Sequence, residues 1–175
     1  MASKKERVFA LTFALLFLFT SVGASAFVIW SASHNKDQTP AQTAQDQINQ
    51  KENKLEGTKL ANFTPVDKVD TVQSTDIKVG TGVEVKDLTT ALTFHYTGAL
   101  AKDGTIFQSS HDTGQPITYP LNQLISGWQQ GIPGMKEGGV RRLLIPSSLG
   151  YGAQSQPGIP ANSDLVFDIE LVKVN

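Results

Sequence analysis

Five aromatic residues stand where their side chains could form an apolar binding site. They lie on predicted inward strand positions, on a short helix or in a glycine-flanked loop: Tyr96, Phe107, Trp128, Tyr151 and Phe167. Packing in a core would explain those on the strands, but not Tyr151, whose phenol could point from its loop into a cavity. Trp128 is either ordinary core or, being large, the floor of a pocket. The chemistry predicted is non-covalent binding of an apolar group.

Composition excludes several other classes of site. The chain has no cysteine, which rules out disulfides, zinc thiolates, thiol catalysis and a lipoprotein anchor. Its formal net charge of -1 gives no basis for nucleic-acid binding. Of the three histidines, His95 is expected to be a structural strand residue, His111 a solvated loop residue and His34 part of a linker. No metal or cofactor is predicted.

The stretch from residue 124 to 146 predicts the helix and strand that hold the centre of this site. Leu124, Ile125, Trp128 and Ile132 fall on one face of a short helix, which Gly131, Pro133 and Gly134 close after about three turns. A turn at residues 137–139 then returns the chain into a strand that carries Val140, Leu143 and Ile145. One short helix is therefore expected to lie directly against a sheet.

Strand signals recur along the remainder of this region. Residues 71–73 and 76–82 are two short candidates, and 90–100 is the clearest, with Phe94 and Tyr96 inward and His95 outward. Further candidates are 105–107 and 117–121, separated by a polar loop, and 164–174 with Leu165, Phe167, Ile169 and Leu171 inward. The predicted fold is α+β: a twisted antiparallel half-barrel of about five to six strands around one short helix.

The N-terminus carries an export signal of one of two kinds. A basic cytoplasmic end at residues 1–7 precedes an uncharged apolar run at 8–30, which is long enough to span a bilayer as a signal anchor. The alternative is a signal peptide cleaved after Ala26, because Ala24 to Ala26 have the small-residue pattern of a cleavage site. The folded domain is expected outside the cytoplasm, membrane-anchored in the first case and secreted or periplasmic in the second.

A polar segment separates this run from the folded domain. Residues 31–62 are rich in Gln, Asn, Thr, Lys and Ala and contain few large apolar residues, so they are expected to form a disordered tether. The folded domain is predicted to cover residues 63–175.

Several motifs in order resemble those of FKBP-type peptidyl-prolyl cis/trans isomerases. From about Thr75 onward they are HYTGAL, DGTIFQSS, YPLNQLISGWQQGIPGMKEGGVRRLLIP, LGYGAQSQPGIP and DLVFDIELVKV. The resemblance covers about 100 residues and implies a twisted sheet wrapped on one helix, with a substrate proline ring over the helix tryptophan. It leaves the first 62 residues outside.

Carried over residue by residue, the resemblance implies the site itself. The residues expected to be catalytic are Tyr96, Phe107, Ile125, Trp128, Tyr151 and Phe167, and those expected to bind substrate are Gln108, Ile117, Leu124, Gln156 and Ile159. The backbone N–H of Ile125 and the phenol of Tyr151 would donate hydrogen bonds to substrate carbonyls. The partners implied are proline-containing unfolded or exported polypeptides.

Three residues depart from the family pattern. Gln108 stands where the family usually has an aspartate, Gln156 where many members have a histidine, and Ile117 where an aromatic residue is frequent. Gln108 can hydrogen-bond to the Tyr96 phenol but carries no negative charge. Weakened affinity for macrolide inhibitors and modest activity are expected. The alternatives are a proline-segment binding module or chaperone with little turnover, and a structural envelope protein with a vestigial pocket.

Overall fold

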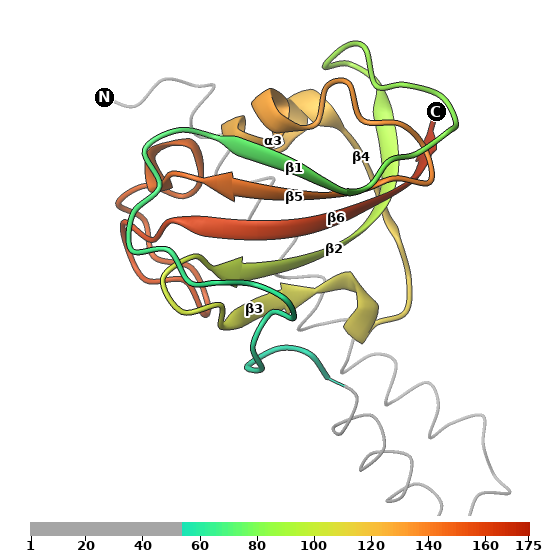
Figure 1. Cartoon of the computed structure of the whole chain (residues 1–175). Coiled ribbons are helices and arrows are strands. Elements are labelled where there is room, and N and C mark those ends of the chain that lie inside the picture. Colours follow the sequence, from blue (N-terminus) through green and yellow to red (C-terminus); the bar gives the residue numbers. More distant parts are fainter. Residues whose placement is uncertain (1–53) are drawn as a thin grey trace, which may run out of the picture. The chain divides into compact units, whose positions relative to one another are not determined.

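The computed structural model describes residues 54–175, and the main feature of this part is one sheet of six strands (Figure 1). The strands are β1 (Gln73–Lys78), β2 (Ala91–Leu100), β3 (Ile106–Ser109), β4 (Ile117–Pro120), β5 (Val140–Ile145) and β6 (Leu165–Val174). Their order is β1-β5-β6-β2-β3, with β4 also paired to β2, and every pair is antiparallel. The predicted antiparallel sheet with one short helix is confirmed.

The two longest strands, β2 and β6, lie side by side in the middle of the sheet. β2 is long enough to carry two short strands on its other edge, because β4 pairs with its first half and β3 with its second half. Between β3 and β4 the chain makes the 3-10 turn η1 (Ser110–Asp112) and a polar loop, where the sequence predicted the interruption. Two further 3-10 turns are η2 (Leu121–Gln123) and η3 (Ser147–Leu149).

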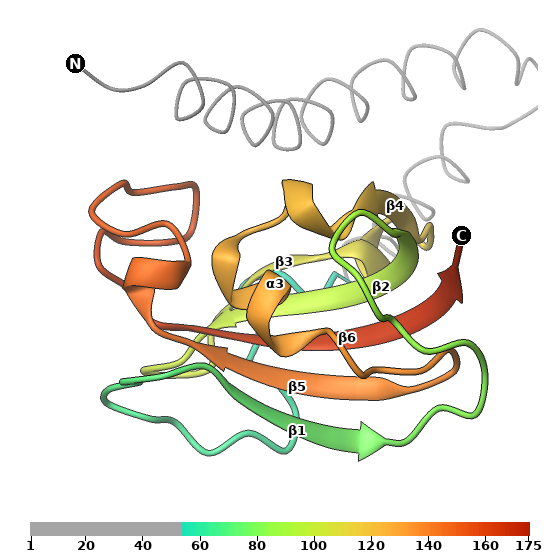
Figure 2. The same ribbon diagram turned by 90° about the horizontal axis from the view of Figure 1, so that it is seen from above.

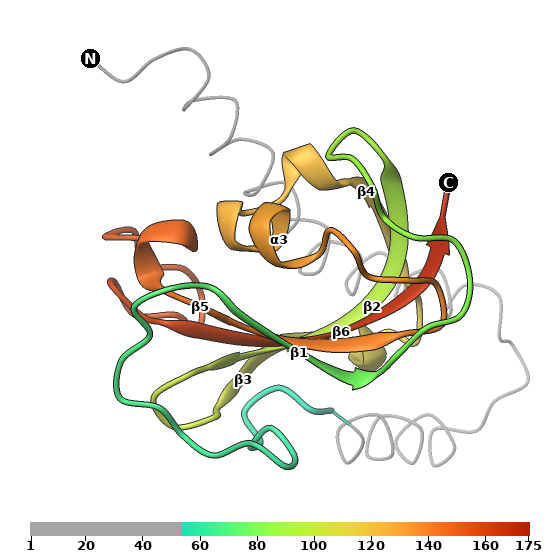
Figure 3. The same cartoon turned by 45° about the horizontal axis from the view of Figure 1, so that its top comes forward.

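The helix α3 (Ser126–Gly131) lies on one face of the sheet, with β2 and β4 curling toward it (Figures 2 and 3). It has six residues, so the prediction of about three turns beginning at Leu124 is wrong. Leu124 has an extended backbone after η2, and Ile125 is the N-cap of the helix. Leu124, Ile125, Trp128 and Ile132 are nevertheless all buried. The apolar spacing identified the buried face correctly, although the η2 turn supplies part of it.

Side chains that alternate along β2 and β6 fill the space between the sheet and α3. On β2 these are Leu92, Phe94 and Tyr96, and on β6 they are Leu165, Phe167, Ile169 and Leu171, all of them buried. The inward positions predicted from the alternation of apolar and polar residues are therefore confirmed.

At the sheet's edge, one strand, β1, stands in place of the two short strands predicted at 71–73 and 76–82, and it covers only residues 73–78. Its pairing with β5 shifts between Asp76 and Lys78, and the strand ends at Lys78. Beyond it Gly80 touches the turn that precedes β5, where an added Cβ would clash with the carbonyl oxygens of Lys136 and Glu137. Only a glycine allows the two backbones to approach so closely at the point where the chain has left β1.

Residues 54–62, predicted to belong to the tether, pack on the domain instead. The N–H of Gly57 donates to the carbonyl of Ile106 (2.8 Å), and the N–H of Ile106 donates to that of Thr58 (2.9 Å). The N–H of Leu55 donates to the Asp112 carboxylate (2.7 Å). The segment therefore pairs along β3, on the side of the sheet opposite to α3 (Figure 3). Its polar composition concealed this pairing, since backbone groups make most of the contacts.

A second, smaller core lies under this segment. Leu60, Ala99, Ile106 and Val166 form a buried cluster, with Phe63 and Leu144 packed against it. The Arg142 guanidinium lies over the Phe63 ring, 5.5 Å from its centroid. Both faces of β6 are thus covered at its start, because Val166 enters this core while Phe167 points to α3.

If this second core belongs to the folded domain, Leu60→Ala should destabilise the full chain by about 2 kcal/mol or more, since it removes a buried side chain. Leu55→Ala, in the same segment but at a 37% exposed position, is the matched control and should change stability by less than about 0.5 kcal/mol. Urea unfolding of both variants measures the difference. Equal losses would contradict this assignment.

The predicted segments at residues 1–7 and 8–30, and residues 31–53 of the predicted tether, lie outside the described residues. Within residues 54–175, no helix is long and apolar enough to cross a membrane.

Candidate functional site

Trp128 lies at the centre of a group of aromatic rings between α3 and the sheet. Its ring centroid is 4.9 Å from that of Phe94, 5.4 Å from that of Phe167 and 5.9 Å from that of Tyr96. Tyr96 and Phe167 present themselves edge-on to the indole, at interplanar angles of 79° and 83°. Such edge-to-face contacts are favourable for aromatic quadrupoles and fix the plane of each ring.

Phe107 extends this group from β3. Its ring is T-shaped to Phe167, with centroids 5.7 Å apart, and Tyr96 contacts Phe167 at 6.4 Å. We call these five residues the aromatic cluster: Phe94, Tyr96, Phe107, Trp128 and Phe167. Strands β2, β3 and β6 and the helix α3 supply them. All are at least nine-tenths buried, and four of them were predicted as site residues.

An irregularity in the pairing of β2 with β3 places Gln108 near the same face as Phe107. The register shifts between Gly98 and Ala99, so that Gln108 pairs with Gly98, whose missing side chain would have pointed at the rings of Phe107 and Phe167. Two successive residues of β3 are therefore directed toward the aromatic cluster, which regular alternation would forbid. Gln108 is half-buried.

The phenols of Tyr96 and Tyr151 remain protonated at neutral pH. Burial raises the pKa of both groups well above the ordinary value of 10.0. Tyr151 adds to the rise in the pKa of Tyr96 by an electrostatic interaction, so the two phenols lie in the same neighbourhood. The predicted approach of the Tyr151 loop to the aromatic residues is consistent with this coupling. Both phenols are thus neutral groups that keep their O–H protons.

The loop between η2 and α3 is held by a side chain that the sequence analysis did not single out. The Gln129 amide donates to the carbonyl of Leu124 (2.7 Å) and to that of Asn122 (3.3 Å). Ile125 follows as the helix N-cap, and the N–H groups at the start of a helix have no partner within it. Leu124 and Ile125 are both buried beside the start of the helix.

The remaining predicted residues lie on two segments next to the cluster. Ile117 on β4 pairs with Phe94, which places it at the edge of β2. Gln156 and Ile159 exchange two backbone hydrogen bonds of 2.9 Å, which close the tip of the loop after η3. An added Cβ on Gly158 would approach the Phe107 Cβ to 3.0 Å, so this loop tip rests on Phe107. Ile159 is buried there, and Gln156 is half-buried.

His95 and His111 form a separate pair outside this group. Their rings stack with centroids 4.6 Å apart, and the His95 Nδ1 lies 3.1 Å from the Ser110 hydroxyl. That hydroxyl also accepts the N–H of Tyr96 (2.9 Å), so Ser110 joins the η1 turn to β2 beside the stacked histidines. In the part of the chain that the structure describes, no three His, Asp or Glu side chains are grouped as metal ligands would be.

Two features of the site were missed from the sequence. Phe94 has the ring nearest to Trp128, and the alternation that placed Tyr96 inward already placed Phe94 on the same face. The Trp128 indole N–H is buried without a hydrogen-bond partner among the described residues. Trp128 is thus surrounded by apolar and aromatic groups, and no sequence signal predicts that its N–H lacks a partner there.

The arrangement groups five apolar aromatic rings, with two neutral phenols and the start of a helix beside them. Nothing in this arrangement is suited to a covalent step. It is suited to a process in which a bound group changes its conformation while its polar atoms exchange hydrogen bonds.

Comparison with known proteins finds relatives for the region that contains this site. Residues 82–172 match the family described as FKBP-type peptidyl-prolyl cis-trans isomerase. The FK506-binding protein of Neisseria meningitidis serogroup C is 54% identical over 86 residues, which are 47% of this chain and 78% of that protein. FkpA of Buchnera aphidicola subsp. Schizaphis graminum, named an FKBP-type peptidyl-prolyl cis-trans isomerase, is 47% identical over 97 residues.

Each match covers only part of this chain, and the match to FkpA also covers only part of that protein. The match to FkpA covers 55% of this chain and 38% of FkpA, so the shared part is little more than a third of that relative. Among solved structures, the crystal structure of AtFKBP13 aligns with a TM-score of 0.55 and 34% sequence identity. That alignment covers 62% of this chain and 96% of AtFKBP13.

Proposed function

Because the chain belongs to the family of FKBP-type peptidyl-prolyl cis-trans isomerases, we propose that its aromatic cluster binds proline-containing segments and accelerates rotation about their X-Pro bonds. The observation that carries this proposal is the Trp128 ring, enclosed edge-on by Tyr96 and Phe167 and backed by Phe94. A proline ring is apolar and compact, and it fits an aromatic surface of this kind.

Rotation about an amide bond needs no nucleophile. Its barrier of about 20 kcal/mol comes from resonance, which places partial charges on the planar carbonyl oxygen and nitrogen. Apolar surroundings such as the aromatic cluster disfavour this charge separation, whereas the twisted amide has lost it and is tolerated. An interaction that is more favourable in the twisted state than in the planar one lowers the barrier.

Donors at the border of the cluster would hold the substrate while its amide twists. In the family the positions of Ile125 and Tyr151 supply them through a backbone N–H and a phenol. Here Ile125 is the N-cap of α3, and Tyr151 carries a neutral phenol, whose pKa burial raises further above its ordinary value. Both features support the same roles in this chain. Leu124, Ile117 and Ile159 would line the approach to the cluster.

Gln108 would modify this activity rather than prevent it. Its amide can donate or accept a hydrogen bond in the position where the family usually has a carboxylate, but it supplies no negative charge. We expect weaker binding of macrolide inhibitors than in relatives with the aspartate. The Neisseria relative is named for binding FK506, so a direct comparison of the two proteins tests this expectation.

The proposed clients are unfolded polypeptides outside the cytoplasm. Support for that location comes from the sequence alone, where Lys4, Lys5 and Arg7 precede the apolar run at 8–30. The proposal includes a membrane anchor or a cleaved signal peptide at this run. Intact mass of the native protein decides between them, because cleavage after Ala26 would remove residues 1–26.

The test of the proposed activity is the rate of cis/trans exchange in a short X-Pro peptide with the full chain present. We expect acceleration that is proportional to protein concentration and that is lost when the protein is unfolded. A peptide series that varies the residue before proline measures how broadly substrates are accepted.

One result would replace the proposal with another. If the folded protein binds the proline peptide without accelerating its exchange, the site is that of a binding module or chaperone. If it neither binds nor accelerates, both proposals are wrong. If it binds without accelerating, Gln108→Asp is the informative variant, because it restores the charge that the family usually has at this position.

A further inference from the structure

The helix that carries Trp128 is too short to hold its own position. α3 has six residues, and isolated helices shorter than about 12 residues are marginal in water. The last carbonyl groups of any helix also lack partners within it. The orientation of the indole ring must therefore be fixed by contacts between α3 and the rest of the domain.

Two glycines bring the backbone of α3 directly onto β5. Gly127 and Gly131 lie one turn apart and so face the same side of the helix. An added Cβ on Gly131 would lie 2.7 Å from the Leu143 Cδ2, and one on Gly127 would lie 2.7 Å from the Ile145 Cδ1. Leu143 and Ile145 are alternate residues of β5, so both point to the helix.

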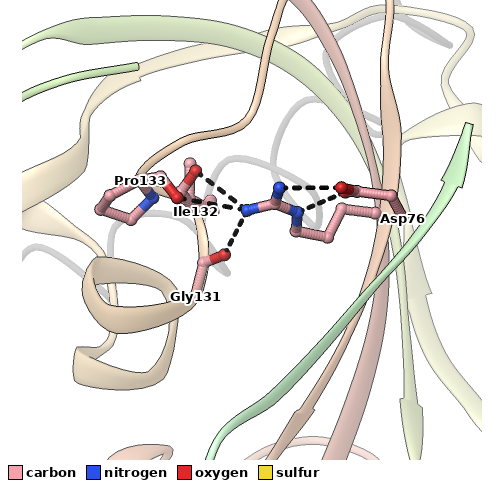
Figure 4. Close-up of polar contacts among 5 residues, drawn as sticks. Asp76, Gly131, Ile132 and Pro133 are labelled. Atoms are coloured by element: carbon pink, nitrogen blue, oxygen red, sulfur yellow. Dashed lines mark hydrogen bonds and ion pairs between the residues drawn. The ribbon is translucent and has the colours of Figure 1, made fainter. Parts of the chain in front are cut away.

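Arg141 is the next residue of β5 on that same face, and it reaches the end of the helix. Its Nη1 lies 2.9 Å from the carbonyl oxygen of Gly131, 3.2 Å from that of Pro133 and 3.4 Å from that of Ile132 (Figure 4). A positive charge at this end also suits the helix dipole. One guanidinium thus contacts three successive carbonyl groups at the end of the helix, and the carbonyl of Ile132 also accepts the N–H of Met135 (2.9 Å).

The guanidinium is itself held from the other side by Asp76 on β1. Its Nε donates to one carboxylate oxygen (2.6 Å) and its Nη2 to the other (3.2 Å), as Figure 4 shows. The Arg141 side chain is only 11% exposed, whereas that of Asp76 is 37% exposed. A bidentate pair of this kind fixes a guanidinium plane in a way that a lysine ammonium cannot.

We propose, on the premise of the isomerase function above, that Arg141 is a positioning residue for prolyl isomerisation. Held by Asp76, it fixes the C-terminal end of α3 and through it the plane of the Trp128 ring. Its effect on catalysis is exerted through Trp128, since its own polar contacts are with Asp76 and the helix end.

The neighbouring residue provides a matched control. Arg142 makes the same kind of bidentate pair with Asp168, with donor to acceptor distances of 2.6 and 2.7 Å, on the opposite face of β5. It also donates to the carbonyl oxygens of Asn62 (2.6 Å) and Ala61 (3.1 Å) and lies over the Phe63 ring, all on the side of the sheet opposite to α3. It has the same chemistry on the same strand, but none of its contacts is with the helix.

The experiment compares Arg141→Lys with Arg142→Lys in the full chain carrying Trp30→Phe, where Trp128 is the only tryptophan. Three quantities are measured: kcat/KM for X-Pro exchange, acrylamide quenching of Trp128 fluorescence, and the folded fraction from urea unfolding. We expect Arg141→Lys to lower kcat/KM about tenfold at full folding, because small misplacements of a site residue cost up to about 100-fold. Its Trp128 should also be quenched more readily. Arg142→Lys should change neither readout.

Equal effects of the two substitutions, or an Arg141→Lys loss that only follows the folded fraction, would overturn the proposal. If Arg141→Lys does not fold, Asp76→Asn replaces it, because that variant keeps the contacts with the helix carbonyls and releases only the outer side of the guanidinium. It should change both readouts in the same direction by less. A wild-type chain without isomerase activity would contradict the proposed function, while the quenching comparison would still decide whether Arg141 positions Trp128.

Discussion

Trp128→Ala is expected to lower kcat/KM for X-Pro exchange by about 100-fold and to destabilise the fold by about 3–5 kcal/mol. The substitution removes the ring that contacts Phe94, Tyr96 and Phe167, and it leaves a cavity under the proposed position of the proline ring. Exchange kinetics and urea unfolding measured on the same preparation separate the two effects.

Two control variants separate the loss of activity from the loss of stability. Leu92→Ala empties a fully buried position outside the aromatic cluster and is expected to cost about 2–5 kcal/mol in stability with kcat/KM retained at full folding. Trp128→Phe keeps an aromatic surface and should retain part of the activity. A Trp128→Ala protein that is folded and fully active would contradict the proposed site.

Gly98→Ala, on β2, is expected to displace two rings of the aromatic cluster and so to lower activity. The added Cβ would lie 2.6 Å from an atom of the Phe107 ring and 2.7 Å from one of the Phe167 ring, so both rings must move. Overpacking of this kind costs about 1–3 kcal/mol in stability. Because the displaced rings belong to the aromatic cluster, we expect kcat/KM to fall about tenfold as well. Exchange kinetics at full folding, alongside urea unfolding, measure both effects.

The control for this prediction is Gly114→Ala. Gly114 has a φ of +67° and no atom near its missing side chain, so alanine there strains the backbone by about 1–2 kcal/mol without touching the cluster. It should lower the midpoint of unfolding and leave exchange kinetics unchanged. If the two variants are alike in activity, the close packing at Gly98 does not shape the site.

Alternation and apolar spacing were sufficient to predict most of the sheet and the side of it on which the site lies. Phe94, Tyr96 and Phe167 were placed inward because side chains of a strand alternate and these positions alternate with polar ones. The family resemblance rather than spacing singled out Gln108, since a regular strand would direct Gln108 away from the face that holds Phe107. The irregular register opposite Gly98 resolves this, and no pattern of residue types predicts it.

Predictions failed where backbone hydrogen bonds or single ion pairs decide the structure. Residues 54–62 have the composition of a linker, yet they pair with β3 through main-chain groups that composition does not describe. The helix was predicted too long because Leu124 and Ile125 continue its apolar spacing from an extended backbone. The contacts of Arg141 were not predicted for a related reason: they join a carboxylate on β1, which is distant in the sequence, to three backbone carbonyl groups at the end of α3.

The pairing of β2 with β6 at the middle of the sheet determines when the domain can form. Leu92 pairs with Val174 and Leu100 with Leu165, so the central ladder joins an early strand to the last one. Folds dominated by such distant pairings close slowly, and a chain that is synthesised from its N-terminus cannot complete this ladder until β6 is available. Phe167 arrives on that strand. Phe167 is therefore made after the other four residues of the aromatic cluster, and a nascent chain has no complete aromatic cluster until its synthesis has passed residue 167.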